Sequence, residues 1–319
     1  MRAKAIDSIG VIVPVFNEAQ ALYENLSTIY NKVSGFVERF FICVVDDGSS
    51  DGTWEEIGRL CETFPEIRGI SLSRNFGKES ALCAGLNEIL KGEKLPDAVL
   101  VMDSDLQHPP EMIAPMLEKL REGYDAAECV RESRGKESVF RKLTALLFYR
   151  VINRFSGFSM SNSSDFKLLD IEVVKAWGEL GEANTFFRGM VEWVGFNKAK
   201  LNFQVAQRNG GTSKFSPVTL MRLAMNALTS YSSAPLFITN FLAGVFFIIA
   251  LVLGAQTLYN KFSGNAVSGF STVILLLLII GSAILFCLGI IGTYISRIYD
   301  EVKSRPRYIV SKKSGNGQI

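Results

Sequence analysis

The chain has 319 residues, 48% of which are hydrophobic, and its 34 basic residues nearly balance its 32 acidic residues. This length supports one large domain with additional elements, or two modest domains. The near balance of charge argues against a protein whose whole surface attracts nucleic acid. The five cysteines are scattered without C-x-x-C spacing, which disfavours structural zinc and is typical of a protein in a reducing compartment.

The first half of the chain alternates short strand-like runs with helix-like segments. Runs of β-branched and other apolar residues predict four strands, over residues 8–16, 40–46, 67–73 and 97–103. Each run leads through a polar turn into a segment with helical spacing. Strands that alternate with helices in this way predict an α/β fold with a doubly wound, mostly parallel sheet.

Polar and mostly acidic side chains follow all four predicted strands. Open α/β sheets bind their ligands beyond the carboxyl ends of the strands. The residues at these strand ends are Asn17 and Glu18, Asp46 and Asp47, Arg74 and Asn75, and Asp103 and Asp105. The sequence therefore predicts a functional site at this edge of the sheet.

The stretch "VMDSDLQHPP", residues 101–110, places two carboxylates one residue apart after an apolar run. Side chains alternate along an extended strand, so Asp103, Asp105 and Gln107 are expected to point the same way. Converging oxygen atoms suit a hard cation such as Mg²⁺ or Mn²⁺, which would offset the repulsion between the carboxylates. The chain has no G-x-x-x-x-G-K-[ST] motif and no G-x-G-x-x-G after the first strand, which argues against P-loop and dinucleotide-binding proteins.

Two long stretches near the end of the chain, residues 223–260 and 262–296, contain no Asp, Glu, Lys or Arg. Each can supply the roughly 20 apolar residues that cross a bilayer. We therefore predict transmembrane helices over residues 235–257 and 272–295. The alternative, a pair of buried helices in a soluble core, is disfavoured because such helices are usually amphipathic, whereas these are apolar on every face.

The flanks of these stretches predict their orientation. Lys261 is the only charged residue between them, whereas the tail after the second stretch carries six basic residues. Basic flanks stay in the cytoplasm, so we expect the N-terminal region and the C-terminus of a multi-pass inner or plasma membrane protein to be cytoplasmic. Residues 216–233 have an amphipathic pattern, which suits a helix at the membrane surface and equally a helix packed on the soluble domain.

Seven motifs occur in a fixed order along the chain: "IVPVFNE", "VVDDGSSDGT", "RNFGKESALCAGL", "MDSDLQHPPE", "SDFKLLD", "FFRGMVEWVGF" and "RNGGTSKF". Together they resemble family 2 glycosyltransferases, in particular the polyprenyl-phosphate branch that includes dolichol-phosphate mannosyltransferase and bactoprenol glucosyltransferases. The resemblance covers residues 8–235, and the two apolar stretches match the bacterial members. It implies a GT-A fold and a metal-dependent hexosyltransferase that moves one sugar, with inversion, from a nucleotide-sugar to polyprenyl phosphate.

The resemblance favours UDP-glucose as donor, with GDP-mannose as the alternative, and undecaprenyl or dolichyl phosphate as acceptor. It implies a domain order, with juxtamembrane amphipathic helices between the catalytic domain and the membrane. The expected segments are a catalytic domain over residues 1–205, an interface segment over 206–234, membrane helices over 235–257 and 272–295, and a basic tail over 296–319. The number of copies in the assembly stays open, and a homo-oligomer is compatible with the sequence.

The resemblance also implies roles for residues at the donor site. The positions expected around the base and ribose are Pro14, Phe16, Glu18, Val45 and Asp47. The metal and diphosphate are expected at Asp103, Asp105 and Gln107, with Ser104 contributing its backbone. Phe16 departs from the pattern, because relatives often have Tyr there and its hydroxyl is absent here.

A second set of positions concerns the reacting groups. Arg131, Arg208 and Lys214 match basic residues that contact the donor or acceptor phosphates, and Asp165 matches an acidic position near the sugar. With Asp105, these four are the candidate catalytic residues.

Three other functions were weighed against this one. A processive polysaccharide synthase usually carries a Q-x-x-R-W motif, which is absent, and two helices cannot enclose a polymer. A non-catalytic, membrane-anchored nucleotide-sugar binding protein would be expected to lack one of the acidic or basic residues above. A nucleotidyl transferase would have no need of a membrane anchor.

Overall fold

The computed structural model describes residues 3–131, 164–180, 187–203, 234–263 and 269–315. The chain forms two compact units. The first, which we call the sheet unit, contains the described residues from 3 to 203 together with residues 306–315. The second, the helix pair, contains the described residues from 234 to 305.

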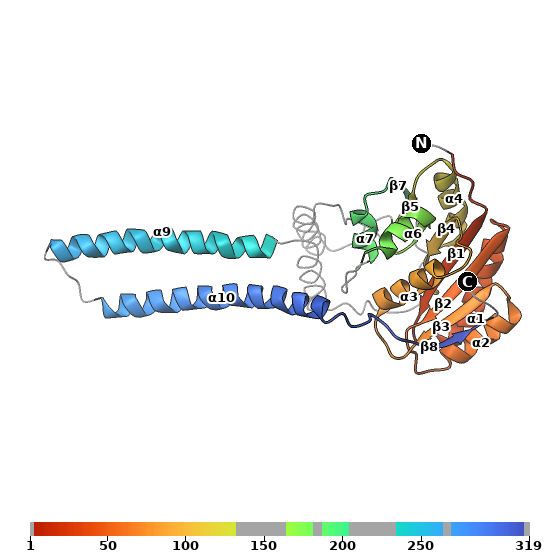
Figure 1. Ribbon diagram of the computed structural model, residues 1–319, viewed down its shortest axis with the longest axis horizontal. Helices are drawn as coiled ribbons and strands as arrows, with labels where there is room; N and C mark the ends of the chain where they lie inside the picture. The colour runs from red at the N-terminus through yellow and green to blue at the C-terminus, as the bar shows by residue number, and fades with distance from the viewer. Residues whose placement is uncertain (1–2, 132–163, 181–186, 204–233, 264–268, 316–319) are drawn as a thin grey trace. The chain divides into compact units, whose positions relative to one another are not determined.

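One eight-stranded sheet forms the centre of the sheet unit, in the order β7-β5-β6-β4-β1-β2-β3-β8 (Figure 1). The strands are β1 Ser8–Val15, β2 Arg39–Asp46, β3 Ile67–Leu72, β4 Ala98–Val101, β5 Ala126–Arg131, β6 Lys167–Asp170, β7 Lys198–Phe203 and β8 Val310–Ser314. The four strands predicted from the sequence, β1 to β4, pair in parallel with one another. The β5–β7 pairing is also parallel, whereas β6 runs antiparallel to β4 and β5, and β8 runs antiparallel to β3.

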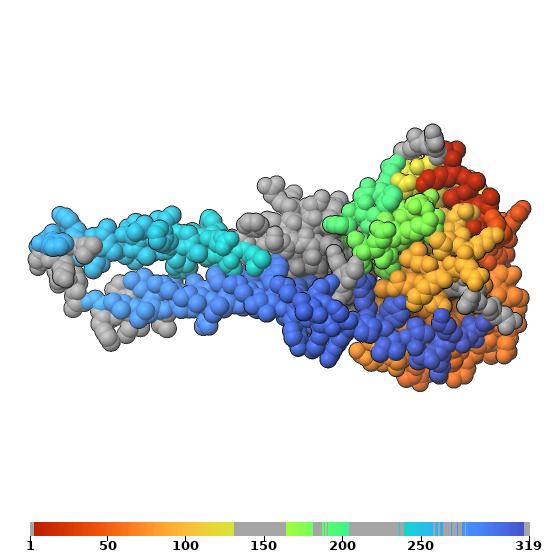
Figure 2. All heavy atoms as spheres, in the orientation of Figure 1, coloured from red at the N-terminus to blue at the C-terminus, as the bar shows by residue number. Residues whose placement is uncertain are grey.

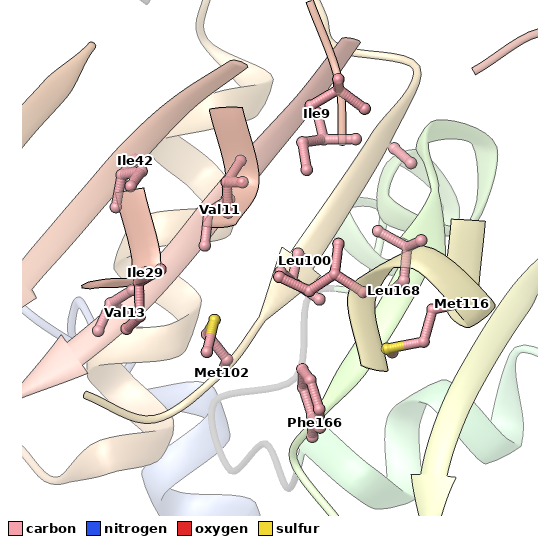
Figure 3. Packing of buried hydrophobic residues seen from close by; sticks show 14 of the residues in the cluster. Ile9, Val11, Val13, Ile29, Ile42, Leu100, Met102, Met116, Phe166 and Leu168 are labelled. Carbon is pink, nitrogen blue, oxygen red and sulfur yellow. The ribbon is translucent and has the colours of Figure 1, made fainter. Parts of the chain in front are cut away.

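Helices cover both faces of this sheet, which confirms the predicted α/β, doubly wound architecture. They are α1 Ala19–Ser34, α2 Thr53–Thr63, α3 Lys78–Leu90, α4 Ile113–Arg121, α6 Ile171–Gly178 and α7 Phe187–Trp193, with a 3₁₀ turn at Pro110–Met112. Alternate residues of β1 face opposite sides, so Ile9, Val11 and Val13 pack with α1, α2 and α4 (Figure 3), whereas Ile12 packs with α3. Apart from the buried ion pair of Lys167 with Glu128, which joins β6 and β5, both faces are mainly apolar, and other polar groups gather at the ends of the strands.

The segment after the second apolar helix returns to the sheet as its edge strand, a feature the sequence analysis did not predict. β8 pairs with β3, from Gly69 opposite Ser314 to Leu72 opposite Val310. The Ser73 N–H also donates to the Ile309 carbonyl at 2.8 Å, just beyond β3. In Figure 2 the dark blue atoms of this segment lie against the orange part of the sheet unit, which includes β3. Residues 306–315 of the predicted basic tail therefore belong to the sheet unit, whereas residues 296–302 are part of α10.

The helix pair consists of α9, Ala234–Phe262, and α10, Phe270–Val302, which pack on one another. Within them Thr239–Thr257 and Ile279–Val302 are long and apolar enough to cross a membrane. Large apolar side chains on both helices, such as Phe247 and Leu285, are more than half exposed. This exposure does not fit two helices buried in a soluble core. Both helices extend beyond the predicted spans, and α10 continues through Arg297 and Asp300.

We predict that ending the chain at Arg305 destabilises the sheet unit. The truncation uncovers the β3 edge, whose unpaired N–H and C=O groups then face water or a second molecule. We expect Tm to fall by at least about 4 °C and aggregation to increase. Thermal unfolding of the detergent-solubilised protein measures this. A chain that ends at Gly315 keeps β8 and serves as the matched control; an equal Tm for both truncations would contradict the prediction.

Candidate active site

A cavity of about 310 Å³ opens at the carboxyl ends of β1, β2 and β4, beside the start of α3. Seven residues selected from the sequence line it: Pro14, Phe16, Glu18, Asp47, Asp103, Ser104 and Asp105. The cavity therefore lies at the edge of the sheet where the sequence predicts the site.

The acidic turn after β2 ties two loops of the cavity together. Both Asp47 carboxylate oxygens accept backbone hydrogen bonds, from the N–H groups of Phe76 and Gly77, each at 2.8 Å. Burial raises the pKa of Asp47, and these two hydrogen bonds act in the opposite direction. Gly48 has φ +67°, and a Cβ there would lie 2.3 Å from the Arg74 carbonyl carbon. Only glycine allows the turn and the loop after β3 to approach this closely.

The end of β1 contributes an exposed aromatic ring and a carboxylate. Phe16 is 43% exposed although it lines the cavity, so its face is open to a flat ligand. The Glu18 carboxylate accepts a hydrogen bond from the Ser104 hydroxyl. Burial raises the pKa of Glu18; the Ser104 hydrogen bond lowers it, and the negative charges of Asp105 and Asp103 raise it again. The cavity is therefore electronegative.

Asp103 and Asp105 come together through a turn and not along an extended strand as predicted. β4 ends at Val101, and Leu106 has φ +55°. One Asp105 oxygen accepts the Gln107 N–H at 3.0 Å, which is the geometry by which aspartate stabilises a turn. Side chains do not alternate here as in a strand, because β4 ends at Val101, before the two aspartates. Gln107 is not among the residues that line the cavity.

The carboxylates present fit a cation that arrives with a phosphate ligand. No set of three His, Cys, Asp or Glu side chains among the described residues is arranged as a metal site. Mg²⁺ in nucleotide-dependent enzymes is usually held by one or two protein carboxylates, with substrate phosphates and water completing its shell. Asp103 and Asp105 can supply those carboxylates, and a cation there would relieve the like-charge repulsion that raises the pKa of Glu18.

Lys78 is a basic residue whose ammonium contacts two carboxylates, those of Asp103 and Asp165. Its Nζ lies 2.5 Å from Asp103 Oδ1 and 2.9 Å from Asp165 Oδ2. Burial lowers the pKa of Lys78, but the two carboxylates outweigh it, and the pKa is raised. Asp165 is only 8% exposed and is not among the cavity-lining residues, so Lys78 connects it to the cavity.

The remaining predicted site residues have different outcomes. The Val45 side chain is fully buried among core residues and does not line the cavity, so only its backbone could face a nucleotide. Arg131 is the last residue of β5, and its side chain lies outside the described part. Arg208, Lys214 and the amphipathic segment over 216–233 also lie outside the described residues.

Lys78 and Gly77 also line the cavity but were not among the residues predicted from the sequence, whereas Asn75 is one of the polar residues that follow the predicted strands. A signal was present. Lys78 directly follows "RNFG" after the third strand and begins a helix, where the helix dipole disfavours a basic residue. A lysine in that position indicates a nearby anionic group.

His108 holds the backbone of Asp103 in place through a hydrogen bond. It is the only histidine in the chain, and its buried ring stacks on Phe166 with centroids 4.8 Å apart. Its Nδ1 accepts the Asp103 N–H at 3.0 Å, which requires that nitrogen to be unprotonated. Burial lowers the pKa of His108 and outweighs the negative charge of Asp103. The neutral imidazole thus positions the Asp103 backbone.

We predict that His108→Phe changes the pH dependence of stability. Phenylalanine keeps the stacking on Phe166 but has no titrating group. Because the His108 pKa is lower in the folded protein, the unfolded chain binds more protons between that pKa and its ordinary value of about 6.5. The contribution of His108 to the stability of the wild type therefore rises with pH through that window and reaches its full value above it. The Tm difference between tag-free wild type and variant should grow from about pH 5 to about pH 7.5; a constant difference would contradict this.

Comparison with known proteins identifies the family of this domain. The model for Glycosyl transferase family 2 matches residues 10–177, which is more than half of the chain. The chain is 34% identical to the "Uncharacterized glycosyltransferase YkcC" of Bacillus subtilis, over 96% of this chain and 94% of that protein. It is 36% identical to the "SfII prophage-derived bactoprenol glucosyl transferase" of Shigella flexneri, over 97% of this chain and 99% of that protein.

Among solved structures, the chain is similar to glucosyl-3-phosphoglycerate synthase of Mycobacterium tuberculosis in complex with Mn²⁺, UDP and phosphoglyceric acid. The identity is 20% and the TM-score 0.49, over 70% of this chain and 78% of that chain. These values are low, and the assignment depends on the family model and the full-length relatives. On those grounds, this chain belongs to glycosyltransferase family 2.

Proposed function

We propose that this protein is an inverting, membrane-bound glycosyltransferase that transfers one sugar from a nucleotide-sugar to a polyprenyl phosphate. One observation carries the proposal. The similarity to a bactoprenol glucosyl transferase extends over 97% of the chain, so it includes both apolar helices as well as the domain with the cavity. A water-soluble acceptor would not explain why both proteins share the two apolar helices. Glucose from UDP-glucose is the sugar we propose, because the relative is named for glucosyl transfer.

The donor would bind in the cavity at the ends of β1, β2 and β4. The exposed ring of Phe16 offers a stacking surface for the base, with Pro14, Glu18 and Asp47 around it. Asp103 and Asp105 would hold a divalent cation, Mg²⁺ or Mn²⁺, on the diphosphate. The cation would stabilise the negative charge that develops on the departing nucleotide.

The acceptor needs little activation, because a phosphate oxygen is already anionic near neutral pH. The protein's task is then to align it with the sugar. Arg131, Arg208 and Lys214 are the residues we propose for the donor and acceptor phosphates. Asp165, which the Lys78 ammonium holds 2.9 Å away, would position a sugar hydroxyl or assist the attacking oxygen.

The membrane orientation is also a proposal. The chain leaves the sheet unit before α9 and rejoins it at Pro306 after α10. Both ends of the helix pair therefore connect to the same folded unit, which supports a hairpin that crosses the membrane twice. With the basic residues after α10, this favours a cytoplasmic sheet unit.

We predict that the purified protein moves labelled glucose from UDP-glucose into a lipid-extractable product. The assay contains undecaprenyl phosphate and Mn²⁺ or Mg²⁺, with GDP-mannose as a parallel donor. EDTA should abolish the product. Asp105→Asn removes a carboxylate charge without changing side-chain size, so transfer should fall at least about a hundredfold with little change in Tm.

Glu122→Gln is the matched control for this variant, because it neutralises an exposed carboxylate that pairs only with Lys119 in the described region. Full transfer by a folded Asp105→Asn protein would contradict the metal site. Label from GDP-mannose alone would change the proposed donor, and a product longer than one sugar would favour a processive synthase. No product from either donor would favour a different nucleotide-sugar donor if nucleotide binding is retained, and a non-catalytic protein if it is not.

We predict that single cysteines at the two ends of the helix pair label differently. Ser263 is exposed just after α9, and Lys303 is exposed just after α10. In a background without the native cysteines, a membrane-impermeant maleimide should label Ser263→Cys in intact spheroplasts. It should label Lys303→Cys only after permeabilisation, because basic flanks stay in the cytoplasm. The reverse pattern would contradict the proposed orientation.

A further inference from the structure

Helix stability does not explain the position of Lys78. It is the first residue of α3, preceded by Gly77 at φ +95°. The free N–H groups at a helix N-terminus carry partial positive charge, and a lysine there is usually destabilising. Lys78 nevertheless lines the cavity, so its attraction to the anionic groups there must outweigh the unfavourable position at the helix N-terminus.

Those groups belong to two different parts of the fold. Asp103 lies in the turn after β4, and Asp165 lies just before β6. The Lys78 ammonium lies 2.5 Å from one carboxylate and 2.9 Å from the other. It therefore bridges the side chain proposed to hold the cation and the side chain proposed to act beside the sugar.

The bridge is held in place by the loop that precedes it. Asp47 accepts the N–H groups of Phe76 and Gly77, directly before Lys78. The N–H groups of Ser80 and Ala81 bond back to the Gly77 carbonyl and begin the helix. The backbone at Lys78 is thus held on both sides, which limits where the ammonium can move.

We propose that Lys78 is a positioning residue that occupies the place of the divalent cation at Asp103 until the donor arrives. This inference rests on the proposed function. A divalent cation on Asp103 would lie close to an ammonium that is itself 2.5 Å from the carboxylate, and the two positive charges repel. Binding of the metal with its diphosphate then displaces Lys78 from Asp103 while Lys78 keeps its contact with Asp165. Without metal, the Lys78 ammonium thus compensates the negative charge of Asp103 and Asp165. With metal at Asp103, Lys78 still holds Asp165 in place.

The test is the affinity of the full-length, detergent-solubilised protein for Mn²⁺ alone, measured by electron paramagnetic resonance of free Mn²⁺. Lys78→Met keeps the length of the side chain and removes the competing charge. We expect it to bind Mn²⁺ about three- to tenfold more tightly than wild type, while sugar transfer decreases because Asp165 loses its contact with the Lys78 ammonium. A residue with a merely structural role would leave the affinity unchanged or weaken it.

Matched variants isolate the effect. Lys78→Arg keeps the charge and should bind Mn²⁺ with nearly wild-type affinity. Lys119→Met removes a partly exposed lysine that pairs with Glu122, and should leave both affinity and transfer unchanged. Equal tightening in Lys119→Met and Lys78→Met would overturn the inference, because a general change of charge would then explain it. Lys78→Gln repeats the test if Lys78→Met does not fold, as judged from Tm.

The outcomes separate this inference from the proposed function. Wild type that binds Mn²⁺ and makes lipid-linked sugar, with no tightening in Lys78→Met or Lys78→Gln, overturns the role of Lys78 alone. Wild type that makes the product but binds no Mn²⁺ before the donor is added supports the inference if Lys78→Met then binds Mn²⁺, and overturns it if Lys78→Met and Lys78→Gln bind none either. Mn²⁺ binding that tightens in Lys78→Met, in a protein that transfers no sugar, supports the inference and overturns the proposed activity.

Discussion

The crowding of carboxylates at one edge of the sheet is the constraint on which the rest of the site depends. Glu18, Asp47, Asp103 and Asp105 line one cavity, and Asp165 is connected to it through Lys78. Neighbouring carboxylates repel one another because they carry the same charge, and partial burial removes the water that would screen this repulsion. Neighbouring groups therefore stabilise these carboxylates: a hydroxyl at Glu18, backbone N–H groups at Asp47 and Asp105, and the Lys78 ammonium shared by Asp103 and Asp165.

The groups that stabilise these carboxylates differ in how much of each carboxylate they leave available to bind a ligand. Asp47 is bonded to two backbone N–H groups and acts mainly as a fixed part of the loop. Asp105 is exposed, and one of its oxygens stabilises its own turn. Asp103 meets an ammonium, which a stronger cation could replace. The arrangement thus separates carboxylates that build the cavity from carboxylates that can exchange partners when a substrate binds.

The edge strand β8 connects this chemistry to the apolar helices. The Ile309 carbonyl accepts the Ser73 N–H at the start of the loop that carries Asn75 and Lys78. Tyr308 is bonded to Asn87, and Arg307 contacts the Leu180 carbonyl. The residues that follow α10 therefore help to hold the loop of Asn75 and Lys78 in place. They connect the apolar helices to a loop that lines the cavity.

The sequence by itself determined the parallel strands β1 to β4, the edge where the site lies and the two apolar helices. These features follow from local patterns: apolar runs, charge-free stretches and polar residues at strand ends. Glu18, Asp47, Asp103 and Asp105 could be selected for the same reason, because each lies at or just after the end of a predicted strand, whereas Phe16 was implied only by the resemblance to family 2 glycosyltransferases.

Tertiary structure alone decided which groups meet. Lys78 and Asp165 are 87 residues apart, and the Ser311 hydroxyl meets the Ser71 carbonyl across 240 residues. The position of Lys78 indicates a nearby anionic group, but no local pattern identifies the partner in either contact, because the partner depends on the order of strands in the sheet. Val45 is buried for a similar reason: strand alternation predicts two faces, but only the packing of α3 determines that its face belongs to the core. Local pattern thus located the site, and long-range packing decided how its charges are balanced.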